Sequence, residues 1–123
     1  MPKKILYIED EQALQKTFSD ASKRAGYEVV SAMDGALGFE LAKVEKPDLI
    51  LLDFILPKMN GLEVLEQLRA EEATKEIPVI IFTNLEGPEN IEKALELGAT
   101  TYLVKSQYSM KEVLEKIREI IGE

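Results

Sequence analysis

Five short apolar runs alternate with five helical patterns along the chain, and this alternation constrains the fold more than any other feature. The runs cover Lys4–Ile8, Glu28–Ala32, Asp48–Leu52, Pro78–Phe82 and Thr101–Val104. After its first residue, Asp48–Leu52 is continuously apolar rather than alternating, which is typical of a strand buried on both faces. Strands that alternate with helices predict a parallel sheet with helices on both faces.

The helical patterns are stripes of apolar residues that recur at spacings of three and four. They consist of Leu14, Phe18 and Ala21; Leu37, Leu41 and Val44; Leu62, Leu65 and Leu68; Ile91, Ala94, Leu95 and Leu97; and Val113, Leu114, Ile117, Ile120 and Ile121. We expect each stripe to pack into the core rather than to form a binding face. At the helix ends, Asp34 and Asn60 are expected as caps, Pro88 suits a first helical position, and Ser109 with Glu112 matches a capping box.

These patterns predict an α/β fold in which five parallel strands and five helices form a doubly wound, flavodoxin-like sheet of order 2-1-3-4-5. The chain has 123 residues, which fits one core, so we expect a single domain over residues 1–123. The sequence contains no internal repeat, low-complexity tract or linker.

Composition excludes several classes of chemistry. The chain has no cysteine and no histidine, which excludes disulfides, zinc–thiolate sites, thiol catalysis and Ser-His-Asp chemistry. Its net charge of −8 repels phosphate backbones, so we expect no nucleic-acid partner. No apolar run is longer than the four residues of Leu49–Leu52, which is too short to cross a bilayer, and the N-terminus does not resemble a signal peptide. We therefore expect a cytoplasmic protein with no membrane contact.

Polar residues stand where the predicted strands end. Glu9 and Asp10 follow the first run, Asp53 closes the third, Thr83 closes the fourth and Lys105 follows the fifth. Ligands of such sheets bind beyond the carboxyl ends of the strands, where the first and third strands are neighbours. Taken singly, an acid pair more often caps a helix, and a lone lysine or threonine is more often solvated or structural. It is hard to obtain by chance that all these polar residues, from four strand ends, lie at one edge of the sheet.

The residue types at this edge suit phosphoryl chemistry. Three carboxylates repel one another in a partly desolvated cleft unless a hard cation binds, and Mg²⁺ prefers oxygen ligands. The hydroxyl of Thr83 and the ammonium of Lys105 can hydrogen-bond or neutralise phosphoryl oxygens. A carboxylate can also act as a nucleophile and form an aspartyl phosphate, and Asp53 closes the central strand.

Five segments together resemble a known family. They are Ile8–Glu11, Leu51–Gly61, Phe82–Thr83, Gly98–Ala99 and Tyr102–Lys105. In this order and spacing, they are similar to the receiver domain of two-component signalling, the family of the chemotaxis response regulator. The resemblance covers essentially the whole chain.

The resemblance implies a metal-dependent phosphoacceptor. Asp53 would accept a phosphoryl group from the phosphohistidine of a sensor kinase or phosphotransfer protein. Asp10 and Asp53 would bind Mg²⁺ together with the backbone carbonyl of Ile55. Glu9 would help through a water molecule or at the rim of the site.

The resemblance also implies a conformational switch. The hydroxyl of Thr83 would move onto the phosphate, Lys105 would pair with a phosphate oxygen, and Tyr102 would turn inward on activation. Simple packing of Tyr102 against a helix remains an alternative. The signalling surface would comprise Thr101–Val104 and the helices before and after it, and it would bind an unknown downstream protein. We expect a monomer or a weak dimer.

Two residues depart from the family pattern. Ser106 stands where the family usually has a proline after a cis bond, and a cis bond without proline costs about 2.5–4 kcal/mol, so we expect a trans or strained peptide. Asn84 stands where a small residue is usual. It would either hinder small phosphodonors or position water and speed hydrolysis, and the sequence leaves both open.

The leading hypothesis is a phosphorylation-controlled switch that turns over no external substrate. A receiver-like binding module that works without phosphorylation is the alternative, and Ser106 and Asn84 favour it somewhat. An aspartate-nucleophile phosphohydrolase usually has a second acid two residues after the nucleophile, where this chain has Ile55. A flavodoxin-like electron carrier would need a phosphate-binding loop after the first strand, where this chain has Glu9–Glu11.

Overall fold

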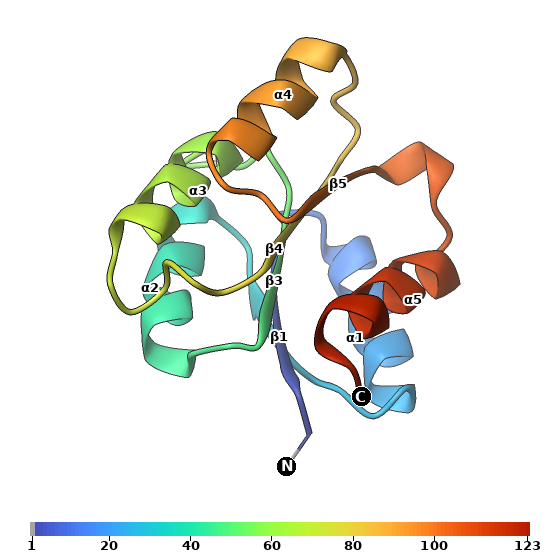
Figure 1. Ribbon diagram of the computed structural model, residues 1–123. Coiled ribbons are helices and arrows are strands. Elements are labelled where there is room, and N and C mark those ends of the chain that lie inside the picture. Colours follow the sequence, from blue (N-terminus) through green and yellow to red (C-terminus); the bar gives the residue numbers. More distant parts are fainter. Residues whose placement is uncertain (1) are drawn as a thin grey trace.

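The computed structural model describes residues 2–123 and has a five-stranded parallel sheet (Figure 1). The strands are β1 (Lys4–Ile8), β2 (Glu28–Ala32), β3 (Leu49–Leu52), β4 (Val79–Thr83) and β5 (Thr101–Val104). The helices are α1 (Gln12–Arg24), α2 (Gly35–Glu45), α3 (Gly61–Ala70), α4 (Pro88–Glu96) and α5 (Met110–Ile121), with a 3-10 turn η1 (Lys105–Gln107) before α5. The strand order is β2-β1-β3-β4-β5, which confirms the predicted doubly wound α/β fold.

Two strands differ by one residue from the predicted ranges. β3 begins at Leu49 rather than Asp48, whose carboxylate accepts a hydrogen bond from the backbone N–H of Lys4 at 2.7 Å. β4 runs from Val79 to Thr83, because Pro78 has no N–H to donate and Thr83 pairs in register with a residue of β5. Thr83 is therefore the last residue of β4.

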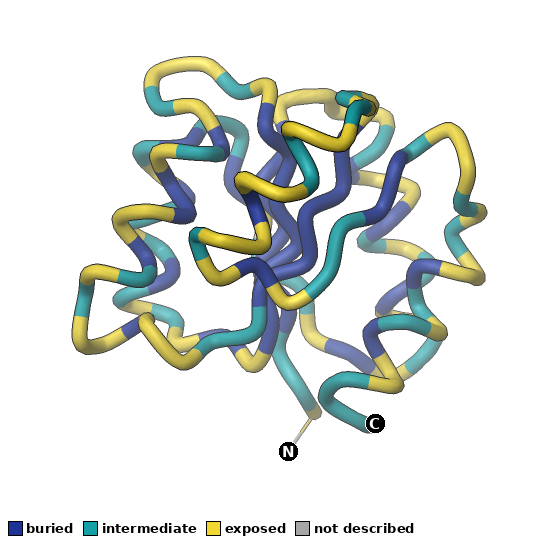
Figure 2. The backbone as a smooth tube through the Cα atoms, turned by 45° about the horizontal axis from the view of Figure 1, so that its top comes forward, coloured by how far each residue is buried: buried dark blue, intermediate teal, exposed yellow. Residues whose placement is uncertain are grey.

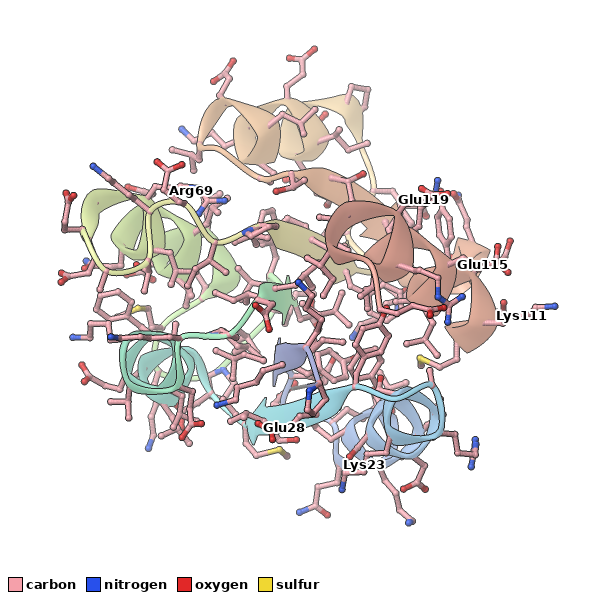
Figure 3. The ribbon with its side chains drawn as sticks, turned by 60° about the horizontal axis from the view of Figure 1, so that its bottom comes forward. Lys23, Glu28, Arg69, Lys111, Glu115 and Glu119 are labelled. Carbon is pink, nitrogen blue, oxygen red and sulfur yellow. The ribbon has the colours of Figure 1, made fainter. Side chains whose placement is uncertain are left out.

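The sheet separates two hydrophobic cores, because successive side chains of a strand point to opposite faces. In β1, Leu6 and Ile8 belong to the core under α2, α3 and α4, whereas Ile5 and Tyr7 belong to the core under α1 and α5. Figure 2 shows the central strands β1, β3 and β4 as the most continuously buried part of the backbone. In Figure 3, which brings the bottom of the molecule forward, α1 and α5 again lie together across the sheet from α2 and α3.

The predicted caps are present. The side chain of Asp34 accepts a hydrogen bond from the backbone N–H of Leu37 at 2.8 Å, which caps α2. Asn60 and Ser109 each form a complete capping box at the start of α3 and α5. These local interactions explain why the helix starts could be predicted from the sequence.

The buried faces of α2 and α4 differ from the prediction. Leu37 and Val44 of α2 are 44% and 72% exposed, and Leu95 of α4 is 48% exposed, so the prediction that they pack into the core is wrong. In α2, small residues face the sheet instead: Gly35, Gly38 and Ala42 are buried. A prediction based on the spacing of large apolar residues therefore misses the face of α2 whose small residues let the helix pack close to the sheet.

Gly35 shows how close this approach is. A Cβ atom added at Gly35 would lie 1.7 Å from the backbone carbonyl oxygen of Met59, in the β3–α3 loop. The N–H of Gly35 also donates to the carbonyl of Pro57 at 3.3 Å. The start of α2 therefore packs directly against the loop that follows the central strand.

We predict that Gly35→Ala lowers the free energy of unfolding by about 1–3 kcal/mol, because the added methyl group has to displace backbone. Urea denaturation followed by circular dichroism measures the change. Leu37→Ala is the matched control on the same helix and should cost about 0.5 kcal/mol or less, since the side chain is largely exposed. An unchanged midpoint for Gly35→Ala would contradict the close packing.

Candidate functional site

Polar side chains from four strand ends gather at the carboxyl edge of the sheet. Glu9 and Asp10 follow β1, Asp53 follows β3, Thr83 ends β4 and Lys105 follows β5. Because β1 and β3 pair directly in the sheet, the backbones of Glu9 and Asp53 start from neighbouring positions. The structure thus brings together the strand-end residues that the sequence singled out.

The ammonium of Lys105 lies between two carboxylates. Its Nζ donates to Oδ2 of Asp53 at 2.8 Å and to Oε1 of Glu9. The three side chains are 12%, 7% and 1% exposed for Lys105, Asp53 and Glu9. Burial alone would lower the pKa of Lys105, but hydrogen bonds to Asp53 and Glu9 outweigh it and raise the pKa above its ordinary value. Lys105 therefore stays charged.

Both carboxylate oxygens of Glu9 have protein donors. Oε1 accepts from Lys105 and from the hydroxyl of Tyr7 at 3.3 Å, and Oε2 accepts from the backbone N–H of Glu11 at 3.1 Å. Burial raises the pKa of Glu9, although the hydrogen bond from Lys105 opposes the rise. Glu9 is 1% exposed, so its side chain lies behind the site rather than at the rim that was one of its two predicted positions.

Two residues that support Glu9 were not singled out from the sequence. Tyr7 is fully buried, and burial raises its pKa, so its hydroxyl remains a donor. The amide of Gln15 on α1 lies within 3.2 Å of the carbonyl oxygens of Tyr7, Glu9 and Ala32, and fixes the ends of β1 and β2. For Tyr7 a signal existed: residues two apart in a strand share a face, which places the phenol beside Glu9.

Glu9, Asp10 and Asp53 form a possible metal site. Each offers a carboxylate oxygen, and these oxygens lie within 4.8 Å of one another. Asp10 is the exposed member, and Asp53 also accepts a hydrogen bond from the backbone N–H of Ile55 at 3.2 Å. Three acids against one ammonium leave an excess of negative charge, and a set of hard oxygen ligands suits Mg²⁺ or Ca²⁺. The residues present therefore fit a divalent cation.

Thr83 and Tyr102 both contact Leu85 in the loop between β4 and α4. The hydroxyl oxygen of buried Thr83 accepts from the backbone N–H of Leu85 at 3.4 Å. The hydroxyl of half-buried Tyr102 donates to the backbone carbonyl of Leu85 at 2.7 Å. Its ring also lies edge-on to Phe54, with 5.9 Å between centroids. One loop residue thus connects the two predicted switch side chains.

The two departures from the family pattern lie on the surface beside Lys105. Residues 2–123 contain no cis peptide, so the Lys105–Ser106 bond is trans and Lys105 opens the turn η1. Asn84 is exposed and lines, with Glu11, Lys105 and Ser106 among others, a groove of about 330 Å³. This groove borders the acidic site on the side of α1 and the β5–α5 connection.

The response regulator receiver domain family matches residues 5–118 of this chain. The chain belongs to that family. Receiver domains are phosphorylation-type signalling switches of two-component systems rather than enzymes that turn over an external substrate, and phosphorylation and Mg²⁺ binding are general features of them. Family membership therefore confirms the resemblance found in the sequence, and it speaks against the phosphohydrolase and electron-carrier hypotheses.

Relatives of two lengths match the chain. The alkaline phosphatase synthesis transcriptional regulatory protein PhoP of Bacillus subtilis is 37% identical over 98% of this chain and 49% of its own length. The chain thus spans about half the length of the first curated relatives that it matches. The polar-differentiation response regulator DivK of Brucella anthropi is 32% identical over 100% of this chain and 99% of its own length.

A solved receiver domain shares the whole fold. The receiver domain of the sensor histidine kinase PA1611 of Pseudomonas aeruginosa superposes with a TM-score of 0.88 at 27% identity, covering 100% of both chains. That structure has a magnesium ion coordinated in its active-site cleft. In the present chain, no helix within residues 2–123 has the length and apolar character needed to cross a membrane.

We predict that Lys105→Met lowers the free energy of unfolding of the metal-free protein by about 3 kcal/mol at pH 7.5, because two buried carboxylates lose their shared counter-ion. Without the ammonium, burial and the charge of Asp53 both raise the pKa of Glu9. When the pKa of Glu9 is higher in the folded than in the unfolded protein, the folded protein binds the proton more tightly, so acid favours folding. The stability lost in Lys105→Met should therefore shrink as the pH falls toward 4.5, the ordinary pKa of a glutamate.

Urea denaturation at several pH values measures the effect. Lys16→Met is the control, because Lys16 forms an ion pair with Asp20 while its side chain is 79% exposed. That pair should contribute little, and its loss should leave the denaturation midpoint near the wild-type value. Equal effects of the two substitutions would show that Lys105 is not a structural counter-ion.

Proposed function

We propose that this chain is a phosphorylation-controlled switch in which Asp53 accepts a phosphoryl group from the phosphohistidine of a sensor histidine kinase or a phosphotransfer protein. The observation that carries the proposal is the carboxylate of Asp53 at the end of the central strand, in contact with Lys105 and within reach of two further acids. In the transfer, the bond between phosphorus and the imidazole nitrogen breaks. A bond between phosphorus and an oxygen of Asp53 forms, and the imidazole keeps the electron pair.

The metal of this proposal is Mg²⁺, held by Asp10, Asp53 and the backbone carbonyl of Ile55. When bound, Mg²⁺ supplies positive charge that neutralises the oxygens of the transferred group. Glu9 would take part through water, because its own oxygens already accept from protein donors. The clustered carboxylate oxygens and the magnesium ion in the PA1611 receiver domain support this assignment.

Lys105 and Thr83 would bind the phosphate once it is formed. Lys105 already contacts Asp53 and would transfer that contact to a phosphate oxygen. The hydroxyl of Thr83 would donate to another oxygen and give up its present contact with the N–H of Leu85. Because Tyr102 is hydrogen-bonded to the carbonyl of Leu85, the change would spread to the face made by α4, β5 and α5. Phosphate would thereby shift the populations of two conformations.

We also propose the partners and the cellular setting of this chain. Residues 1–123 form a single receiver domain that acts on a downstream protein through the α4–β5–α5 face. It works as a monomer or weak dimer in the cytoplasm, without contacts to nucleic acid or membrane. Slow loss of its own phosphate, rather than turnover of an external substrate, resets it. The negative net charge of −8 supports the absence of a nucleic-acid partner.

We predict that incubation with Mg²⁺ and acetyl phosphate adds one phosphoryl group per chain, measured by intact mass. Asp53→Asn should remove the gain, because the amide is not a nucleophile for phosphorus, and chelation of the metal should remove it as well. Asp48→Asn is the matched control, since this exposed acid lies at the amino end of β3.

If acetyl phosphate fails but sensor kinases succeed, the result agrees with the expectation that Asn84 hinders small phosphodonors. If kinases fail too, the phosphate-independent binding module becomes the better reading. In that case Asp53→Asn should bind the downstream partner as well as the wild type does.

We predict that beryllofluoride with Mg²⁺, a mimic of the phosphoryl group, shifts backbone NMR resonances beyond the site at Leu85, Tyr102 and along α5. Thr83→Ala should keep the shifts near Asp53 and lose those at Tyr102, because the hydroxyl that couples them is gone. Thr101→Ala is the control on the neighbouring strand. Shifts confined to the acidic site in the wild type would contradict the switch.

A further inference from the structure

A buried phenol lies behind the acidic site. Tyr7 is 0% exposed, and its hydroxyl donates to Oε1 of Glu9 at 3.3 Å. The same oxygen accepts from the ammonium of Lys105. Tyr7, Glu9, Lys105 and Asp53 thus form a continuous chain of side-chain hydrogen bonds from the core under α1 and α5 to the proposed phosphoacceptor.

We infer that Tyr7 is a positioning residue for Lys105: its hydroxyl fixes the carboxylate of Glu9, and that carboxylate holds the ammonium at the phosphorylation site. The inference rests on the proposed function of Asp53 and Lys105. In this inference Glu9 holds the ammonium of Lys105, and Glu9 is itself held by a phenol in the hydrophobic core.

The phenol is itself held firmly. The ring of Tyr7 packs edge-on against Phe18, with 4.9 Å between centroids. The backbone on both sides of the site is fixed by Gln15, whose amide donates to the carbonyls of Tyr7 at 2.9 Å and Glu9 at 3.0 Å. β1 also pairs with a strand on each side. The hydroxyl therefore presents a donor at a nearly fixed point, which is the requirement for a positioning group.

Lys105 needs a second anchor for a physical reason. The Asp53 carboxylate that it now contacts has to attack phosphorus and then carry the phosphate, so this contact changes during the reaction. A lysine side chain is long and flexible, so a partner that does not change during the reaction holds its ammonium more firmly than Asp53 alone. Glu9 remains in place throughout, because Tyr7 and the N–H of Glu11 hold both of its oxygens.

Tyr7→Phe tests the inference with little change in packing, because it removes only the hydroxyl. Tyr27→Phe is the matched control. Tyr27 is also buried in the core under α1 and α5, and its hydroxyl donates to the carbonyl of Gly122 at 2.7 Å, near the C-terminus. Both variants lose one phenol hydrogen bond, so any general loss of stability appears in both.

Two readouts separate positioning from simple packing. The first is phosphorylation by acetyl phosphate at saturating Mg²⁺, resolved into the maximal rate constant and the half-saturating donor concentration. Tyr7→Phe should lower the maximal rate constant about tenfold, as expected for one lost hydrogen bond to a charged group, and leave the half-saturating concentration unchanged. The second is the ¹⁵N resonance of the Lys105 ammonium in metal-free protein, which should shift or broaden in Tyr7→Phe. Tyr27→Phe should match the wild type in both.

The outcomes are distinguishable from those of the proposed function. A wild-type rate constant or an unmoved Lys105 resonance in Tyr7→Phe overturns the inference and leaves the phosphoacceptor role of Asp53 intact. Equal changes in Tyr27→Phe overturn it too, since they would reflect general loosening of the core. If the wild type takes up no phosphate, the proposed function fails, and the Lys105 resonance still decides whether Tyr7 positions the ammonium.

Discussion

The ammonium of Lys105, shared between the carboxylates of Glu9 and Asp53, joins the ends of three strands at the carboxyl edge of the sheet. Because β4 lies between β3 and β5 in the sheet, the lysine side chain has to reach across the end of the strand that carries Thr83. One cation cannot neutralise three clustered acids, so the same contact leaves negative charge that a divalent ion could neutralise. The charges of Lys105 and the three acids therefore affect both the stability of the fold and the binding of a cation.

Most of this arrangement could be predicted from the sequence because it follows from topology. Once the runs are assigned as parallel strands of order 2-1-3-4-5, the residues after each run have to meet at one edge, and Glu9, Asp53, Thr83 and Lys105 do so. What could not be predicted depends on packing distance. The apolar stripe predicted that Leu37 packs into the core, whereas the small residue Gly35 makes the close contact with the β3–α3 loop. The buried carboxylate of Glu9 accepts a hydrogen bond from Tyr7, which has the pattern of an ordinary apolar strand residue in the sequence.

The loop between β4 and α4 contacts both side chains of the proposed switch, Thr83 and Tyr102. The backbone N–H of Leu85 donates to Thr83 and its carbonyl accepts from Tyr102, so one residue is hydrogen-bonded to both side chains. On the other side of β5, the chain after Lys105 closes into the turn η1 with a trans peptide, and the N–H of Tyr108 returns to the carbonyl of Lys105 at 3.4 Å. Lys105 thus contacts Glu9 and Asp53 although Ser106 replaces the proline that the family usually has there.

The division of the molecule into two cores has an evolutionary consequence. Alternate side chains of every central strand belong to separate clusters, so a change of volume on one side reaches the other only through the backbone of the sheet. Substitutions under α1 and α5 and substitutions under α2, α3 and α4 should therefore accumulate with little epistasis between them. Tyr7 is an exception, because it packs in one core while its hydroxyl reaches the shared edge. A substitution at this core position therefore also changes the hydrogen bonds at the acidic edge of the sheet.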